Sequence, residues 1–260
     1  MLRPRITPCL LVRNKGLVKT VNFSASKYVG DPINAVRIFN EKEVDELIVL
    51  DIDATATSKG PDATMVAHLA AECRMPLCYG GGVKTVEQAK TVIGLGVEKV
   101  AISSAAVENP ELVSRIAAEI GAQSVVIVLD VRKSRGGSGY EVFTRNGTIA
   151  TGKCPVDFAR RLEDLGAGEI VINSIDRDGE MKGYDMALAG LVRDAISVPM
   201  TVLGGAGSLK HVGELVRAFG VVGAAAGSLF VFKGVYKAVL INYPSPTEKD
   251  ELIRANMVRG

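Results

Sequence analysis

Two glycine-rich turns in this 260-residue chain could hold phosphate groups. Each is paired with a second short motif of small residues: Gly80-Gly81-Gly82 with Ser103-Ser104, and Gly204-Gly205-Ala206-Gly207 with Gly227-Ser228. All four motifs follow a short apolar run that is typical of a buried β-strand. Glycines there let backbone N–H groups approach an anion closely, and a helix that begins behind them adds positive potential. One such turn alone would be explained by tight geometry, but two symmetric pairs predict a ligand with two phosphates.

One carboxyl group has surroundings suited to proton transfer. Asp130 lies near the end of the apolar run VVIVLDVRK. A carboxyl group among apolar side chains is expected to have its pKa raised towards neutral by desolvation, which suits a general acid or base. Asp130 is therefore the predicted catalytic residue.

The sequence offers few cysteine or histidine residues arranged for other kinds of catalysis or for metal binding. The four cysteines (Cys9, Cys73, Cys78 and Cys154) form no C-x-x-C pair, so we expect reduced thiols and no zinc site. The two histidines, His68 and His211, fall on expected helices and are interpreted as surface residues. We expect no metal and no bound cofactor.

Composition narrows the classes of partner. Lys and Arg number 31 against 29 Asp and Glu, and this near-balance gives no electrostatic footprint for nucleic acid. No run approaches the ~18 apolar residues of a membrane span, and the N-terminus lacks the apolar stretch of a secretory signal. We expect a cytoplasmic protein that binds neither nucleic acid nor membrane.

Short apolar runs alternate with amphipathic stretches along the whole chain. Continuous apolar runs suit strands that are buried on both faces of a parallel sheet. Eight βα units in about 250 residues predict an α/β fold, the (β/α)8 or TIM barrel, as one domain over residues 1–260. Tyr140–Ala150 alternates around an Asn-Gly turn and predicts a β-hairpin inserted after the fifth strand. The expected strands are Ile6–Val12, Leu47–Ile52, Pro76–Tyr79, Lys99–Ile102, Val125–Leu129, Ile170–Asn173, Met200–Leu203 and Val221–Ala226.

An internal repeat divides the barrel. LDID, YGGGVKT and ISSAAV in the first half correspond to SIDRDG, LGGAGS and AAGSLF in the second. The offsets are 125 from Asp51 to Asp176, 124 from Gly80 to Gly204 and 124 from Ser103 to Gly227. We therefore expect half-barrels at about 1–122 and 123–243, followed by a tail over 244–260.

Four charged residues fall at the opposite ends of the strands. Arg5, Glu46, Lys99 and Glu169 lie at or just before the starts of strands one, two, four and six. Two positive and two negative side chains at one end of a barrel predict a closed ring of ion pairs. Such a ring could also do no more than satisfy buried strand ends.

The motifs PCLLV, VGDP, DELIVLDI, GGGVKT, SSAAV, DRDGEMKGYD and GGAGS resemble the cyclase subunit of imidazole glycerol-phosphate synthase, from about Arg5 to Phe230. The resemblance implies a barrel that takes ammonia from a glutaminase partner, as a heterodimer. The ammonia joins a ribonucleotide with two phosphates, which is cleaved to imidazole glycerol phosphate and an aminoimidazole carboxamide ribotide in histidine biosynthesis. The charged ring would then be the ammonia gate.

The resemblance also implies roles for residues at the mouth of the barrel, which is the end formed by the carboxyl ends of the strands. It implies one phosphate at Gly81, Gly82, Ser103 and Ser104, and the other at Gly205, Gly207, Gly227 and Ser228. Asp51, Asn173, Asp176 and Asp178 would line the pocket, and Lys19 would lie on a long, mobile first loop.

This sequence departs from the family at one catalytic position. The family uses two aspartates, at the ends of strands one and five, and the strand-one position here is Leu11. Leucine cannot transfer a proton, so loss of one member of the pair should lower the rate by about 10²–10⁴-fold.

Other segments resemble a particular branch of the family. PCLLV, VKTVNF and AAGSLFVFKGVYKAVLINYP are similar to variants associated with surface-polysaccharide genes. That likeness implies ammonia delivery to a sugar amidotransferase in lipopolysaccharide biosynthesis, and Val231–Tyr243 could be a partner surface or simply a last helix. Two alternatives stay open: a catalytically silent, ammonia-conducting partner of the glutaminase, and the sibling sugar isomerase, which Leu11 and the charged ring disfavour.

Overall fold

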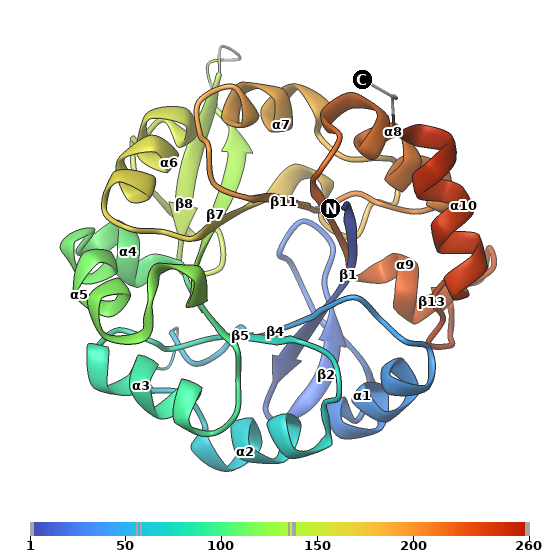
Figure 1. Cartoon of the computed structure of the whole chain (residues 1–260), viewed down its shortest axis with the longest axis horizontal. Helices are drawn as coiled ribbons and strands as arrows, with labels where there is room; N and C mark the ends of the chain where they lie inside the picture. Colours follow the sequence, from blue (N-terminus) through green and yellow to red (C-terminus); the bar gives the residue numbers. More distant parts are fainter. Residues whose placement is uncertain (1–2, 56, 58, 135, 137–138, 258–260) are drawn as a thin grey trace.

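The computed structural model describes residues 3–55, 57, 59–134, 136 and 139–257. Within these residues, eight parallel strands close into a barrel that helices surround (Figure 1). In order around the barrel they are β1 (Arg5–Arg13), β4 (Leu47–Asp51), β5 (Leu77–Gly80), β6 (Lys99–Ile102), β7 (Val125–Lys133), β10 (Glu169–Ser174), β11 (Met200–Leu203) and β12 (Gly223–Ala226). Strand β12 pairs with β1, so the sheet has no open edge. The expected (β/α)8 barrel is confirmed.

Capping side chains set the starts of several helices. Asp31, Asp62 and Thr85 each accept a hydrogen bond from the N–H of the third helical residue, which satisfies a donor that has no partner within the helix. The outer helices are α1 (Pro32–Glu41), α2 (Ala63–Glu72), α3 (Val86–Gly94), α4 (Ser104–Glu108), α5 (Glu111–Ile120), α6 (Pro155–Asp164), α7 (Met186–Arg193), α8 (Leu209–Phe219), α9 (Ser228–Val231) and α10 (Pro246–Asn256).

Strand periodicity separates two apolar regions. Because successive side chains point to opposite faces of a strand, Ile6, Leu10 and Val12 of β1 pack in the large core between strands and helices. Thr7, Cys9 and Leu11 point to the opposite face, into the barrel, where Cys9 belongs to a separate small cluster. The barrel is therefore filled from inside by one side of each strand.

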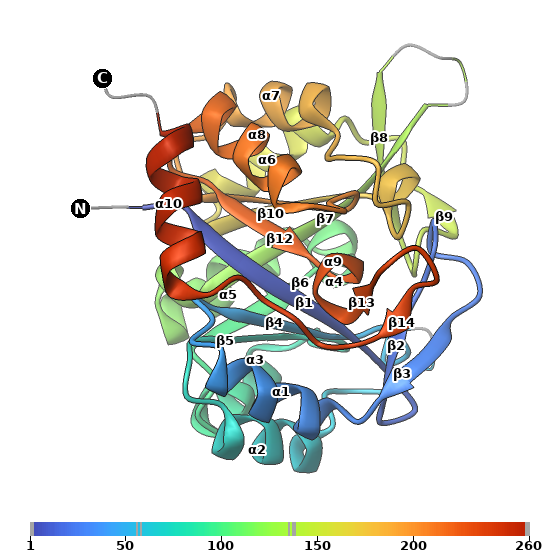
Figure 2. The same cartoon turned by 90° about the vertical axis from the view of Figure 1, so that its right-hand side faces the viewer.

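Two strands run past the barrel at the mouth. Strands β1 and β7 are each nine residues long and pair antiparallel with β-ribbons. The ribbons are β2 (Gly16–Lys19) with β3 (Lys27–Gly30), and β8 (Tyr140–Thr144) with β9 (Ile149–Ala150). Figure 2 shows β2, β3 and β9 together at this end of the molecule. The predicted hairpin after the fifth strand is confirmed. The prediction that Lys19 lies on a long first loop is wrong, since Lys19 belongs to β2.

The strand register corrects the alignment of the two halves. Leu11 pairs with Leu50 as Asp130 pairs with Asn173, so these positions correspond between the halves. Three residues beyond Leu50 and Asn173, this correspondence matches Asp53 with Asp176, at an offset of 123 residues. The motif spacing instead predicted that Asp51 corresponds to Asp176, at an offset of 125. Ion pairs support the new alignment: Arg13 Nε lies 2.9 Å from Asp53 Oδ1, and Arg132 Nε lies 3.5 Å from Asp176 Oδ1.

The glycine turns shift by one residue in the same way. Gly80 pairs with Leu50, and Leu203 pairs with Asn173, so Gly81 corresponds to Gly204 and Gly82 to Gly205. The repeat itself is confirmed, because β6 with α4 and β12 with α9 keep the expected offset of 124.

The C-terminal segment is ordered against the barrel base. Helix α10 packs beside α8, and its buried Lys249 donates to Asp45 Oδ1 at 2.6 Å. Residues 231–243 contain the short hairpin of β13 (Phe232–Lys233) and β14 (Ala238–Val239) rather than a last helix. Residues 258–260 of the expected tail lie outside the described residues.

Gly223 provides a test of packing at the base. A Cβ at this position would collide with Thr201 Oγ1, which donates to Glu169. We expect Gly223→Ala to lower the free energy of unfolding by about 1–3 kcal/mol, measured by urea denaturation. Gly94→Ala, where a Cβ meets open space at a helix end, is the control and should change stability by less than about 1 kcal/mol. Equal stabilities for the two variants would contradict this packing.

Candidate functional site

A cavity opens at the carboxyl ends of the barrel strands. Residues from both halves of the chain line it, and they include most of those predicted from the sequence. The predicted residues found there are Leu11, Lys19, Asp51, Gly81, Gly82, Ser103, Ser104, Asp130, Asn173, Asp178, Gly205, Gly227 and Ser228. This is the end of the barrel at which enzymes of this fold carry their active sites.

Asp130 combines a fixed position with an altered acidity. Asn173 Nδ2 donates a hydrogen bond to Asp130 Oδ1 at 2.9 Å from the neighbouring strand. Burial raises the pKa of Asp130 to about 7, although the hydrogen bond from Asn173 works in the opposite direction. A carboxyl group with this pKa can both give and take a proton near neutral pH.

The corresponding position in the first half carries no such group. Leu11 and Leu50 occupy the places of Asp130 and Asn173, and both pack against the apolar cluster inside the barrel. The mouth therefore has one polar wall and one apolar wall. Asp130 thus has no carboxyl counterpart at position 11.

Asp178 and the first ribbon form a second polar group beside the cavity. Thr20 Oγ1 donates to Asp178 Oδ2 at 2.6 Å, and the N–H of Phe23 donates to the same oxygen at 3.3 Å. Burial raises the pKa of Asp178 despite these bonds. Through these hydrogen bonds, Asp178 connects the ribbon that follows β1 with the segment that follows β10.

The side chain of Lys19 extends from the first ribbon towards Gly227, at the end of the eighth barrel strand, β12. It is buried, and its Nζ donates to the backbone oxygen of Cys9 at 2.7 Å. Burial lowers the pKa of Lys19. A Cβ at Gly227 would collide with the Lys19 ammonium, so glycine there lets the charge approach the second glycine-serine motif.

The glycines at the mouth are required by close backbone approach. Gly82 has φ +72° and Gly205 has φ +106°, conformations that L-residues rarely adopt. A Cβ on Gly82 would collide with Lys59 O, and one on Gly205 with Gly183 O. These contacts explain the glycines by packing, and phosphate binding at them stays a prediction.

Two predicted residues lie elsewhere. The exposed Asp176 accepts a hydrogen bond from the N–H of Lys133 at 2.9 Å and pairs with Arg132, so it supports the second ribbon instead of lining the cavity. The N–H of Gly207 donates to His211 Nδ1 at 3.1 Å. Gly207 is therefore engaged with a helix side chain and is absent from the cavity wall.

Several residues at the mouth were not found from the sequence. They include Arg13, Thr20, Lys59, Lys84 and Arg145. The tip of the second ribbon crosses towards the first half: the N–H of Arg145 donates to Ser104 Oγ at 3.1 Å, and Asn146 Nδ2 donates to Ile52 O at 2.7 Å. The Asn-Gly turn predicted this tip, but nothing local indicates which strand ends it reaches.

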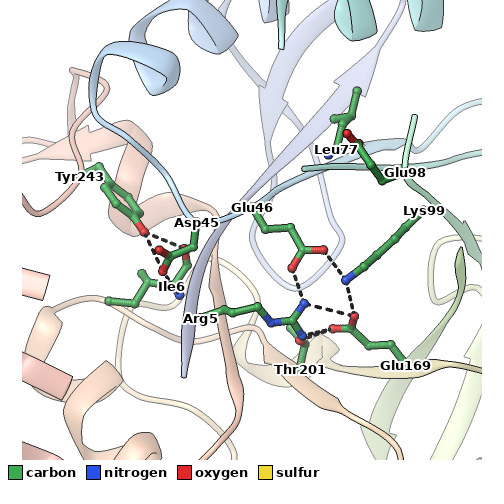
Figure 3. Close-up of polar contacts among 10 residues, drawn as sticks. All are labelled: Arg5, Ile6, Asp45, Glu46, Leu77, Glu98, Lys99, Glu169, Thr201 and Tyr243. Carbon is green, nitrogen blue, oxygen red and sulfur yellow. Dashed lines mark hydrogen bonds and ion pairs between the residues drawn. The ribbon is translucent and has the colours of Figure 1, made fainter. Parts of the chain in front are cut away.

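At the other end of the barrel, the four predicted charges meet in a closed ring (Figure 3). Arg5 lies 2.5 Å from Glu46 and 2.7 Å from Glu169. Lys99 lies 2.6 Å from Glu46 and 2.8 Å from Glu169. Each charge thus touches two of opposite sign, and Thr201 Oγ1 adds a hydrogen bond to Glu169 at 2.6 Å.

Attraction within the ring favours the charged forms of Glu169 and Lys99. Burial by itself would raise the pKa of Glu169, but attraction by Arg5 and Lys99 outweighs it, and the pKa is lowered. Burial likewise opposes the charge on Lys99, yet the two carboxylates raise its pKa.

Across the described ranges, no group of His, Cys, Asp and Glu is arranged to hold a metal ion. No helix in those ranges is long and apolar enough to cross a membrane.

The raised pKa of Asp130 has a consequence for stability. The folded state holds this proton up to about pH 7, whereas the unfolded state loses it near its ordinary value of about 3.9, so ionisation destabilises the fold as pH rises between these values. We expect Asp130→Asn to be more stable than the natural protein by about 1–3 kcal/mol near pH 8. Near pH 4 the two should unfold at the same urea concentration. A pH-independent difference would contradict the buried, near-neutral carboxyl group.

Comparison with known proteins identifies the family. Residues 5–237 match the model of the histidine biosynthesis protein family. A Vibrio vulnificus protein named "Putative imidazole glycerol phosphate synthase subunit hisF3" is 55% identical over 253 residues, 97% of each chain. The Clostridium botulinum (strain Okra / Type B1) protein named "Imidazole glycerol phosphate synthase subunit HisF" is 38% identical over 243 residues, 94% of this chain and 96% of its own. The chain belongs to the histidine biosynthesis protein family.

Proposed function

We propose that this chain is the ammonia-using synthase subunit of a glutamine amidotransferase complex of the imidazole glycerol phosphate synthase type. The observation that carries the proposal is that two features lie at opposite ends of the same barrel. A closed ring of four charges lies at the amino ends of the strands, and a cavity with two glycine turns and Asp130 lies at the carboxyl ends. Ammonia admitted at the ring would meet a ligand held at the mouth.

The names of the relatives support the nature of the ligand. Two relatives are named as imidazole glycerol phosphate synthase subunits, and we propose the ligand that this resemblance implies, a ribonucleotide with two phosphates, one at each glycine turn. Asp130 would then be the acid or base for ring closure and cleavage to imidazole glycerol phosphate and the carboxamide ribotide. The ammonia would come from a separate glutaminase chain, since Cys9 lies inside the barrel and His68 and His211 belong to outer helices.

Leu11 limits the cyclase reaction in this proposal. A mouth with a single proton-transfer group should turn over the ribonucleotide slowly. The relative from Pseudomonas aeruginosa, 52% identical over 96% of this chain, is named "Putative imidazole glycerol phosphate synthase subunit hisF2", and such numbering suggests a further copy beside an ordinary subunit. We propose that ammonia leaving this barrel serves a sugar amidotransferase in surface-polysaccharide biosynthesis, in the cytoplasm.

The apolar wall favours a second candidate. With Leu11 and Leu50 facing the cavity, the barrel could conduct ammonia and activate the glutaminase without any chemistry of its own. The sibling sugar isomerase is disfavoured, because it too depends on an aspartate at the end of strand one and has no ammonia source for the ring to admit.

Restoring the missing carboxyl group tests the role of Leu11. We expect Leu11→Asp to raise ammonium-dependent turnover of the two-phosphate ribonucleotide by about 10² or more, because a second proton-transfer group then faces Asp130. The measurement is product formation at saturating ammonium without a partner. Leu11→Asn, which adds polarity without an acid, is the control and should give no comparable gain. A Leu11→Asp rate equal to that of the natural protein would assign the deficit to other residues.

Removing one charge of the ring tests the gate. In complex with the glutaminase, Lys99→Ala should lower the glutamine-dependent rate by roughly tenfold, since two carboxylates lose a shared partner and the ring reorganises. The rate with external ammonium should stay unchanged, which also shows that the variant is folded. Lys90→Ala removes a comparable ion pair on the outer surface and should change neither rate. Equal losses with glutamine and with ammonium for Lys99→Ala would exclude a gate.

A further inference from the structure

One hydroxyl group lies inside the barrel without a partner. Thr7 is 1% exposed, and its Oγ1 has no hydrogen-bond partner among the described residues. Thr7 follows Arg5 of the ring by two residues and precedes Cys9 and Leu11 of the cavity by two and four. Because strand side chains alternate between faces, all four point into the barrel, and Thr7 lies between ring and mouth.

The surroundings of this hydroxyl differ on its two sides: the register of β1 and β4 places Glu46 of the ring opposite Thr7, and the side towards the mouth is apolar. The neighbouring strand places Ala225 beside Thr7. Burial raises the pKa of the Cys9 and Cys78 thiols, so both are neutral at physiological pH. The other apolar side chains buried in the cluster inside the barrel are Ile48, Ala101, Val126, Val128, Val171 and Leu203. A charged molecule is strongly disfavoured in such a place, whereas a small neutral one is not.

Thr7 makes the fold less stable than it need be. A buried hydroxyl without a hydrogen bond is destabilising, and valine has the same shape without the polar atom. A hydroxyl retained here needs a partner that can enter the barrel, and the partner must be small and able to donate or accept a hydrogen bond. Ammonia and water share this chemistry.

We propose that Thr7 Oγ1 is a binding site for neutral ammonia on its way from the ring to the mouth. The inference rests on the proposed function, in which ammonia enters at the ring. The hydroxyl can accept a hydrogen bond from ammonia, or donate one to its lone pair, at the point where the path leaves the charged ring and enters the apolar interior. Thr7 thereby lowers the barrier to crossing and makes no contact with the ligand at the mouth.

The experiment follows nitrogen from glutamine. The complex with the glutaminase is given glutamine labelled with ¹⁵N in its amide, unlabelled ammonium and the two-phosphate ribonucleotide. We measure labelled product per glutamine hydrolysed. Thr7→Val should lower this ratio about five- to tenfold, as expected for loss of roughly one neutral hydrogen bond, and Thr7→Ser should restore it. Product formation from ammonium alone should not change.

Tyr79 provides the matched control. Among the residues that the structure describes, its Oη is the other buried side-chain oxygen without a hydrogen-bond partner, but Tyr79 belongs to the layer between strands and helices. Tyr79→Phe should leave the transfer ratio unchanged, while the melting temperature of Thr7→Val should rise by roughly 2–4 °C.

The outcomes separate the two claims. If the natural complex transfers label and Thr7→Val transfers it equally well, the hydroxyl binds at most a water molecule and the inference is overturned. A lower melting temperature for Thr7→Val would also overturn it, by revealing a structural partner. If the natural complex transfers no label while ammonium alone gives product, the proposed passage through the ring falls, and this inference with it.

Discussion

Each of the four charged side chains at the base of the barrel touches two side chains of opposite sign. Glu46 and Glu169 are almost fully buried, and Arg5 and Lys99 provide the partners that buried carboxylates require. The ring also fixes what surrounds it, since Gly223 leaves the space that Thr201 needs to reach Glu169. A closed, charged base separates the apolar interior from solvent and leaves the mouth as the open end.

The two halves of the barrel share a backbone and differ in chemistry. Both long strands, β1 and β7, carry a ribbon and an arginine-aspartate ion pair at the mouth. Between these shared features, Asp130 and Asn173 of one half stand where Leu11 and Leu50 stand in the other. The repeat thus places a glycine turn on each side of the cavity, whereas a carboxyl group at the level of Asp130 belongs to one half and is replaced by Leu11 in the other.

The sequence predicts the elements that depend on local pattern and fails where distant strands decide. Apolar runs and the repeated glycine motifs were enough for the barrel, the second hairpin and the charged ring. The register was not predicted: the spacing matched Asp51 with Asp176, whereas the pairing of β4 with β1 and of β10 with β7 matches Asp53 with Asp176. The first ribbon was missed because VKTVNF carries no turn signal, and its pairing depends on an overhanging β1. Asp176 and Gly207 were assigned to the cavity by resemblance, but Lys133 and His211 hold them outside it.

The central claim is that the mouth keeps its ligand and lacks half of its proton-transfer machinery. The most direct measurement combines calorimetric binding of the two-phosphate ribonucleotide with turnover at saturating ammonium and no partner. We expect binding with turnover far below that of ordinary enzymes, which is roughly 1 per second or more. Turnover at or above that rate would contradict the weight placed on Leu11. Absence of binding would contradict the assignment of the glycine turns.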